Sequence, residues 1–561
     1  MAIDRTRYPL TAAAFDRMGA DDHVARILQM DTVWEGIRAR VASGEQLPVP
    51  QLWNVVPDAE YTQAARSVSW QGDLVYAGSG LGLLHAYEMA RRGWRVMIFD
   101  RTEVGCVHRE WNISRSELQA LVDGGGWTWA ELDQVIMNEY RDGLVRFHRD
   151  DEPVTLHLPE VLNIALDAGA LLAMTRAKLA AIGAEIVDFC TLDAVSVSND
   201  ANQPVLVRVR TAANTTQTFG ARVVIDGMGT TSPLSLQRFG GRPYAGVCPT
   251  VGTVASGFVE GDAPALHDRT VGDILLTVSD AQRTQQYMWE GFPGRGDELT
   301  VYLFYYDTLI PGKPLGRPSP TLLALFEEYF LYLETYKPAN GAVHHHKPVY
   351  GYIPARHSLQ RTEAPLLRGV LPIGDAAGQQ SPLTFCGFGS HVRNLRRTTG
   401  MLDTVLRAGL EQTDALALVT PFQVNVSLNW VFSRFMQPWG QIDADVNTLQ
   451  HHFMGVLERH GTAFATRFFR DEMRWSDYHK MILGMFFAYL PIVGIAGRVL
   501  RLRTIDWIAD YLRFTWAGAL AAGARFVGVT MLERMAADLP IRWRLRLLAQ
   551  IGEWRVMGWD R

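Results

Sequence analysis

Residues 73–101 of the chain have the sequence DLVYAGSGLGLLHAYEMARRGWRVMIFDR, and this stretch determines the fold class that we predict. It starts with an apolar strand at 74–77, which leads into a glycine turn at 78–82. A helix then extends to about Arg92, and a second apolar strand occupies 96–99. A strand, a tight glycine turn, a helix and a second strand form a βαβ unit of the dinucleotide-binding type.

The glycine turn and the end of the second strand contain the residue types that hold a dinucleotide. The turn consists of Gly78, Ser79, Gly80, Leu81 and Gly82. Glycines let the backbone approach a pyrophosphate, and the helix N-terminus that follows attracts its charge. Asp100, with Arg101 beside it, ends the second strand, where a carboxylate takes ribose hydroxyls. Gly82 comes one residue early for the usual spacing, so we expect a shortened turn; an ordinary strand–helix turn is the alternative.

A second nucleotide signal is the segment GDAAGQQSPLTFCGFG at 374–389, which follows a buried strand and precedes a helix. In flavoproteins an aspartate at such a place contacts the ribityl chain, and the next helix N-terminus faces the flavin pyrimidine. Two separate nucleotide signals favour FAD over NAD, and an acid that only caps the loop is the alternative. The residues assigned to the cofactor here are Gly374, Asp375, Pro382, Gly387 and Gly389.

Two further motifs lie between these segments. REWNISR at 109–115 follows the second strand, and we assign its last residue, Arg115, to the FAD pyrophosphate. VVIDGMGTTSPL at 223–234 places Asp226 at a strand end close to the nucleotide. A solvated arginine and a plain β-turn are the respective alternatives.

Composition excludes several classes of protein. The chain has 561 residues, of which 48% are hydrophobic and 20% charged, and its net charge of −5 gives no reason to expect a nucleic-acid partner. The four cysteines are far apart without a CxxC pair, and the N-terminus lacks the apolar segment of a secretory signal, so we expect a cytoplasmic protein. The run His344-His345-His346 points to alternating faces of a strand, and we predict no metal site.

The order of elements predicts an α/β protein: a GR2-like FAD-binding fold with an antiparallel β-sheet substrate domain and an α-helical C-terminal region. The expected boundaries are a helical N-terminal extension at 1–70, the FAD-binding domain at 71–250 and 346–420, the β-rich substrate domain at 251–345, and the helical region at 421–561.

The C-terminal region combines apolar helices with flanking arginine and tryptophan. Residues 481–497 are uncharged but contain Pro491, and the run is shorter than the ~20 residues that a spanning helix needs. Residues 514–524 are apolar, and Trp543 stands between two arginines. This pattern is typical of an interfacial contact with a membrane lipid surface, and a buried helical subdomain is the alternative.

Five segments together resemble one family of flavoproteins. RGWRVMIFDR, REWNISR, DGMGTTSPL, QYMWEGFP (286–293) and GDAAGQQSPLTFCGFG resemble the CruA/CruP-type lycopene cyclases, in consistent order over roughly residues 70–400. The resemblance implies a peripheral membrane enzyme that uses FAD, reduced by NAD(P)H, to cyclise lycopene or a related linear carotene to β-rings. The reaction is net non-redox: an acid protonates a terminal double bond, the cation closes a ring and a base removes a proton.

Such a reaction needs a carboxyl group that burial keeps protonated. Three candidates follow from residue type and position. Glu290 lies in an aromatic strand, and Asp307 ends the strand VYLFYYDT where related cyclases have an acidic motif. Glu334, in LYLETYKP, is the third. A salt-bridged or solvent-facing acid remains the alternative for each.

Two other functions stay open at this point. The chain could be an FAD-dependent oxidoreductase of another isoprenoid, either a prenyl reductase or a monooxygenase. It could also be a paralogue that binds flavin or carotenoid without turnover.

Overall fold

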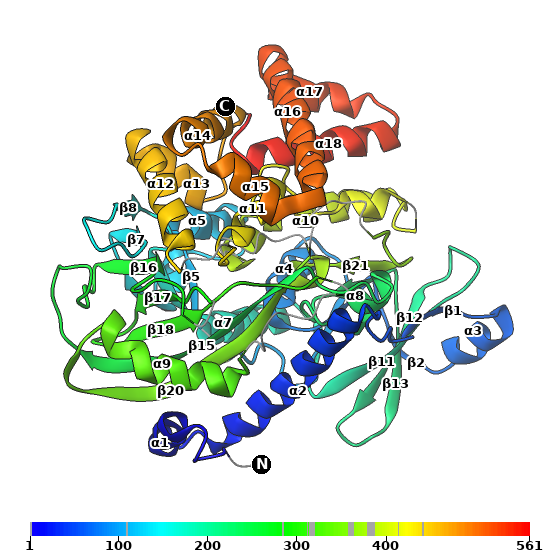
Figure 1. The fold of residues 1–561 in the computed structure, drawn as a ribbon. Helices are drawn as coiled ribbons and strands as arrows, with labels where there is room; N and C mark the ends of the chain where they lie inside the picture. The colour runs from blue at the N-terminus through cyan, green and yellow to red at the C-terminus, as the bar shows by residue number, and fades with distance from the viewer. Residues whose placement is uncertain are drawn as a thin grey trace.

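The computed structural model describes residues 3–107, 110–282, 285–310, 312, 320–356, 364–378, 387–412, 414–439 and 443–560. Within them the predicted βαβ unit forms the centre of a parallel sheet with the strand order β10-β4-β3-β14-β21 (Figure 1). Its strands are β10 (Glu185–Val187), β4 (Val96–Phe99), β3 (Leu74–Ala77), β14 (Val223–Asp226) and β21 (Val370–Pro372). The sheet is buried on both faces, which explains why its strands are continuous apolar runs.

Helices cover one face of this sheet and a second sheet covers the other. Leu74 and Tyr76 pack against the helices α4 (Gly80–Arg91), α7 (Ala168–Ala181) and α10 (Gly387–Arg407). Val75 and Ala77, which alternate with them, pack against the second sheet. The α/β, GR2-like class predicted from the sequence is therefore confirmed.

The second sheet has the order β1-β11-β12-β13-β2. It contains β1 (Trp53–Val55), β11 (Cys190–Val197), β12 (Val205–Thr211), β13 (Thr216–Ala221) and β2 (Val68–Gln71). The edge strands β1 and β2 come from the segment that we expected to be a separate N-terminal extension. Both are short and largely exposed, so they lack the apolar run that identifies a strand in sequence.

The large third sheet follows the order β19-β15-β18-β17-β16-β7-β8, and β20 also pairs with β15. Its strands are β7 (Asp142–Arg146), β8 (Thr155–Pro159), β15 (Gly246–Phe258), β16 (Val271–Leu276), β17 (Met288–Pro293), β18 (Leu299–Phe304), β19 (Asp307–Thr308) and β20 (Ala339–Ala355). Its pairs are antiparallel as expected, except for β16 with β7. The strands β7 and β8 lie outside the predicted substrate domain; β7 joins this sheet through a long-range pairing with β16, and β8 pairs with β7.

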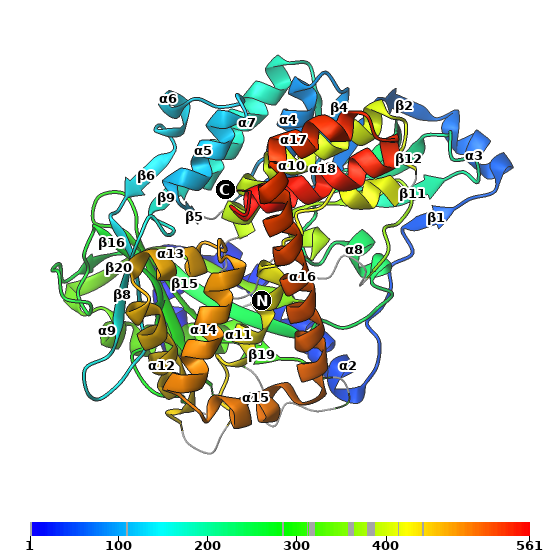
Figure 2. The same ribbon diagram turned by 90° about the horizontal axis from the view of Figure 1, so that it is seen from above.

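The two faces of the third sheet differ in what covers them. One packs against α1 (Pro9–Met18) and α9 (Leu322–Tyr336), while α2 (Asp21–Ser43) lies along β20. The other faces the C-terminal helices. A small sheet of β5 (Glu110–Ile113), β9 (Ile164–Asp167) and β6 (Ile136–Glu139) lies beside α5 (Arg115–Asp123), as Figure 2 shows.

The described residues after 420 contain helices and no strand, as predicted. They form α11 (Trp430–Arg434), α12 (Asp445–Arg459), α13 (Thr462–Phe469), α14 (Trp475–Ala488), α15 (Ile492–Leu500), the short η4 (Arg501–Arg503), α16 (Thr504–Val527), α17 (Val529–Ala537) and α18 (Ile541–Val556). By length and composition, no single helix in the described chain could cross a membrane; α14 together with residues 492–527 passes the same test only as a pair bent by 110°.

Candidate active site

The glycine turn has the geometry of a phosphate cradle. Gly78 has a φ of 91°, and a Cβ at this position would lie 2.7 Å from the backbone of Gly227, so only glycine is accommodated. A Cβ at Gly80, where α4 begins, would meet no atom within 4 Å. Open space therefore lies in front of the backbone N–H groups of the helix, which is the arrangement that favours an anion.

Asp100 supports this turn directly. Its Oδ2 accepts hydrogen bonds from the Ser79 N–H and hydroxyl, both 2.8 Å long. Its Oδ1 accepts two more from Thr102, both 3.1 Å long. Contact of Asp100 with ribose hydroxyls stays a prediction; in the structure the carboxylate fixes the conformation of the turn. Arg101, beside it, is exposed.

The structure brings the separate nucleotide motifs to one edge of the parallel sheet. The end of β14, Asp226, is in register with Ala77 on one side and Pro372 on the other. The short helix η1 (Gly374–Ala377) follows β21, and a Cβ at Gly374 would lie 3.1 Å from the Leu81 side chain. The glycine turn and the Gly374 loop are therefore adjacent, and Asp375 is exposed at this edge.

Asp226 itself is buried. Burial raises the pKa of its carboxyl to about 6, although Ser232 donates a hydrogen bond of 2.7 Å to it and the Met228 N–H a second of 3.2 Å. These bonds order the loop after β14. Asp226 thus supports, from within the protein, the edge of the parallel sheet where Ala77, Asp226 and Pro372 end their strands (the nucleotide edge).

The predicted pyrophosphate ligand Arg115 makes other contacts. Its guanidinium forms two hydrogen bonds of 2.7 Å with Glu139 and lies 4.3 Å from the centre of the Trp129 ring. These partners hold the side chain at the start of α5, and none of its described contacts reaches the glycine turn. Its assignment to the pyrophosphate stays a prediction.

Gly389 of α10 is required for close packing of this helix against α5. A Cβ at Gly389 would lie 2.6 Å from Glu117 Oε1, and Glu117 pairs with Arg393 at 3.2 Å. Gly387 is the first residue of α10. Pro382, also assigned to the cofactor, lies outside the described residues.

A histidine that was not selected from the sequence connects α10 to the glycine turn. His391 is buried and forms a hydrogen bond with the Leu81 backbone, and burial lowers its pKa to about 4. The ring is therefore neutral at pH 7. The contact between two residues so distant in the chain leaves no local pattern in the sequence.

Among the three candidate acids, Glu290 has the environment that proton donation requires. It lies on β17 between Met288 and Phe292, so it points to the face of the sheet that the C-terminal helices cover. In the described chain no protein group forms a hydrogen bond or ion pair with it. Burial alone raises the pKa of its carboxyl to about 8, although part of the residue surface stays accessible.

Aromatic residues surround this carboxyl. Tyr302 is directly across the strand pair from Glu290. Tyr140 and Tyr306 are buried, and both lie close enough for the Glu290 charge to add to the burial that raises their pKa values. The Tyr140 hydroxyl donates a hydrogen bond of 3.1 Å to Asn112 in β5. The acid thus lies in an aromatic environment connected to β5.

Trp111, the residue before Asn112 in β5, approaches the predicted flavin region. Trp111 stacks on Phe388, at the start of α10, with 4.4 Å between the ring centres. The structure therefore connects the Glu290 region to the helix that follows the Gly374 loop.

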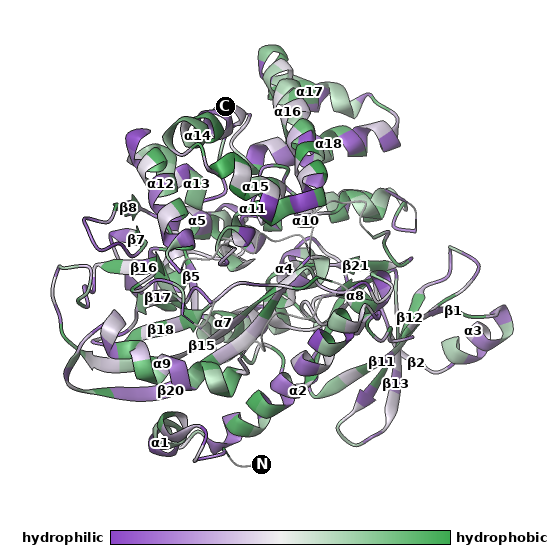
Figure 3. Ribbon diagram, in the orientation of Figure 1, coloured by the Kyte–Doolittle hydropathy of each residue, from purple (hydrophilic) through white to green (hydrophobic). Residues whose placement is uncertain are grey.

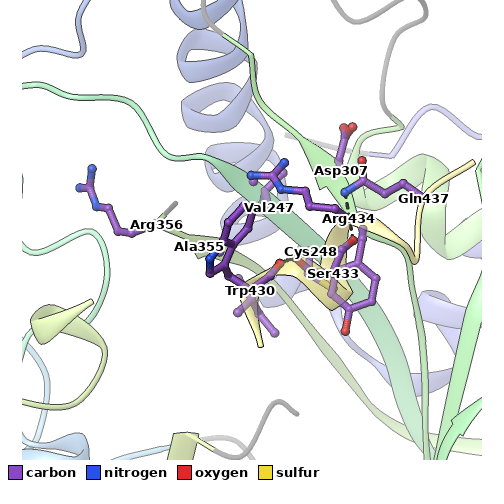
Figure 4. Close-up of a pocket in the computed structure, with 12 residues that line it drawn as sticks. Val247, Cys248, Asp307, Ala355, Arg356, Trp430, Ser433, Arg434 and Gln437 are labelled. Carbon is purple, nitrogen blue, oxygen red and sulfur yellow. Dashed lines mark hydrogen bonds between the residues drawn. The ribbon is translucent and has the colours of Figure 1, made fainter. Parts of the chain in front are cut away.

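Asp307 lies in the neighbouring pocket, shown in Figure 4, between the third sheet and α11. Cys248 and Tyr306 line this pocket, and the charge of Glu290 acts on both. Glu290 and Asp307 therefore belong to one region of the molecule. Glu334 is exposed on α9, which covers the opposite face of the sheet, and the structure does not bring it to them.

Comparisons with known proteins support the fold. A comparison with protein-family models gives no match, and neither does one with curated proteins. Solved structures do match. A geranylgeranyl bacteriochlorophyll reductase-like protein from Thermoplasma acidophilum has a TM-score of 0.55 at 15% identity, over 77% of this chain and 99% of that one.

Two other structures are similar. The halogenase PltM, determined in complex with phloroglucinol and FAD, has a TM-score of 0.51 at 14% identity, over 87% of this chain and 98% of its own. A flavoprotein/dehydrogenase from Cytophaga hutchinsonii has a TM-score of 0.50 at 12% identity, over 76% of this chain and 99% of its own. The chain therefore has the fold of FAD-dependent oxidoreductases, halogenases and geranylgeranyl reductase-like proteins.

Proposed function

We propose that the protein is an FAD-dependent lycopene cyclase in which Glu290 donates the proton that starts ring closure. The observation that carries the proposal is a carboxyl group with a pKa of about 8, in an aromatic environment where no described residue forms an ion pair with it. At pH 7 such a group is about 90% protonated, so it is an acid of the strength that the reaction needs.

The residues at the nucleotide edge fit FAD. The cradle at Gly78 and Gly80, the N-terminus of α4 and the exposed Asp375 would hold the dinucleotide, and the start of α10 would face the pyrimidine. When bound and reduced by NAD(P)H, FAD would supply negative charge close to the reacting end of the carotene.

The chain's own groups then account for the proton transfers. Glu290 gives its proton to a terminal double bond of lycopene, and the electron pair of that bond forms the new C–H bond. A second double bond attacks the resulting cation and closes the ring. A carboxylate, either Glu290 or Asp307, then accepts a proton from the ring, so that no electrons are gained or lost.

The surroundings of Glu290 suit a carbocation. The faces of Tyr140, Tyr302 and Tyr306 carry negative charge density that attracts a cation. Met288 and Phe292 exclude water, which would otherwise capture the cation.

The C-terminal helices supply a route for a water-insoluble substrate. Of the large hydrophobic residues that the described chain exposes, most lie between residues 475 and 543. Figure 3 colours many residues of α14, α15 and α16 as hydrophobic. Phe487, Leu502 and Phe526 are 78%, 84% and 96% exposed. The η4 arginines Arg501 and Arg503 flank Leu502, as is typical of helices that lie in a membrane interface. This face docks to the membrane, from which the enzyme takes the carotene.

Expression in a lycopene-accumulating host, followed by pigment analysis, tests the proposal. We expect lycopene to be replaced by products with β-rings. Unchanged lycopene in cells that contain soluble, FAD-loaded protein would contradict it.

The second candidate is an FAD-dependent oxidoreductase that acts on another isoprenoid, and the similarity to the reductase-like protein from Thermoplasma acidophilum favours it. A reductase or monooxygenase consumes one NAD(P)H per turnover, whereas a cyclase consumes none. Measuring NAD(P)H oxidation against product separates the two candidates.

A further inference from the structure

Arg434 is a buried cation that the proposed cyclisation does not use. It ends α11 and is 9% exposed. Its Nη1 donates a hydrogen bond of 2.5 Å to the Thr308 hydroxyl, and its Nη2 donates one of 3.0 Å to the carbonyl of Ala245. In the part of the chain that the structure describes, no carboxylate lies within ion-pair distance of this guanidinium.

A buried arginine without a nearby anion lowers the free energy of unfolding. Removing a guanidinium from water without an anion nearby loses solvation free energy that two neutral acceptors do not restore. The positive charge of Arg503 adds to the cost, and with burial it lowers the pKa of Arg434 to about 9. The N–H donors left over form a planar fork that matches the oxygens of a phosphate.

The guanidinium lines a small pocket that is partly open to solvent (Figure 4). Ser433 and Gln437 of the same helical segment line it as well, and so does Asp307 across from them. The Thr308 hydroxyl donates a hydrogen bond of 2.6 Å to Gln437 Oε1, so its lone pairs face Arg434 and fix the guanidinium at the pocket. A polar group of an entering ligand would therefore meet a positioned cation.

The pocket lies beside the exposed apolar face. α11 contacts α15, which leads into η4, where Arg503 lies close to Arg434 and Leu502 projects outward. Ile353, another lining residue, is also partly exposed. A ligand with an apolar chain can therefore place its head group at Arg434 and its chain along the face formed by α14, α15 and α16.

We propose that this pocket binds the phosphate head group of a membrane lipid, with Arg434 as its principal ligand. The phosphate supplies the anion that the buried arginine lacks. The proposed membrane docking enters only as the source of the phosphate, and the site borders the proposed carotene region through Asp307 and Tyr306.

Calorimetric titration of the full-length chain with decyl phosphate, inorganic phosphate and decanol tests the site. We expect decyl phosphate to bind more tightly than inorganic phosphate, and decanol to bind more weakly than decyl phosphate. Arg434→Met should weaken decyl phosphate binding by at least about tenfold, the value of a hydrogen-bonded charge pair. Arg66→Gln, an exposed arginine of the distant second sheet region, should leave it unchanged.

Equal affinities for decyl phosphate and decanol, or an unchanged affinity in Arg434→Met, would overturn the site. If inorganic phosphate binds as tightly as decyl phosphate, the apolar chain does not contribute to binding, and the proposal that the phosphate belongs to a lipid is wrong. Because these titrations need no cyclase activity, they fail or succeed independently of the pigment assay.

Thermal unfolding gives a second test, in which the variant that binds decyl phosphate more weakly is expected to be at least as stable without ligand. Without ligand, Arg434→Met should melt at the same temperature as the parent protein or higher, since it removes an uncompensated buried charge. Decyl phosphate should raise the melting temperature of the parent protein and not that of the variant. A lower melting temperature for ligand-free Arg434→Met would show that Arg434 stabilises the fold, contrary to the proposal.

Discussion

The hydroxyl of Tyr140 donates a hydrogen bond of 3.1 Å to the side-chain oxygen of Asn112. Tyr140 borders the Glu290 carboxyl, and the residue next to Asn112, Trp111, stacks on Phe388 at the start of α10. A short series of contacts thus joins the candidate acid to the helix that would face the flavin. These contacts support the proposal that the acid and the cofactor act in one reaction.

Replacing Glu290 by Gln should abolish cyclisation and leave FAD content unchanged. The amide keeps the shape of the side chain but cannot donate the proton, and loss of a general acid costs about 100-fold or more. Pigment analysis gives activity and flavin absorbance gives FAD content. Glu334→Gln, which changes an exposed residue of α9, is the matched control and should keep full activity. An active Glu290→Gln protein would exclude Glu290 as the acid.

Activity should depend on pH with a single descending limb centred near pH 8. The carboxyl must be protonated to act, and its pKa in the folded protein is about 8. Because the folded pKa exceeds that of the unfolded chain, protonation stabilises the fold at low pH, and this contribution is lost as pH rises towards 8. Glu290→Gln should therefore flatten the pH dependence of the free energy of unfolding between about pH 5 and 8, measured by denaturant titration. A steeper dependence in the variant would contradict the assignment.

Gly78→Ala and Gly82→Ala should differ sharply in flavin binding. A methyl group at Gly78 would overlap the Gly227 backbone and its φ is positive, whereas one at Gly82 would meet Tyr76 at 3.9 Å, an ordinary contact. We expect Gly78→Ala to lose FAD and to be destabilised by about 1 kcal/mol or more. Gly82→Ala should retain FAD. Equal flavin content in the two purified variants would show that the turn does not hold the cofactor.

Replacing Phe487 and Phe526 by Ser should reduce co-sedimentation with lipid vesicles. Each exposed phenylalanine contributes about 1.5–3 kcal/mol when buried in an apolar phase, so the double variant should bind at least about tenfold more weakly. Leu331→Ser on α9 removes an exposed hydrophobic residue from the opposite side of the third sheet and should have no effect. Similar losses in both proteins would place the lipid contact elsewhere.

The nucleotide edge was largely predictable from the sequence because its signals are local. The strand at 74–77, the turn at 78–82 and the strand at 96–99 follow from apolar runs and glycine positions a few residues apart. The role of Asp100 was less accessible, since the sequence places it at a strand end but does not show that it accepts hydrogen bonds from Ser79. The pairing of Arg115 with Glu139 was also hidden, because the two residues meet only through the packing of α5 on the small sheet.

By itself, the sequence determined the α/β class, the βαβ unit and the helical C-terminal region, all of which depend on neighbouring residues. The tertiary structure decided which acid is buried among aromatic side chains, which buried arginine has no carboxylate partner among the described residues, and which helices expose apolar residues. Those properties depend on burial, and burial is set by contacts between segments hundreds of residues apart. For this reason the sequence could name Glu290, Asp307 and Glu334 as candidates, while only the packing of the third sheet distinguishes Glu290 from the others.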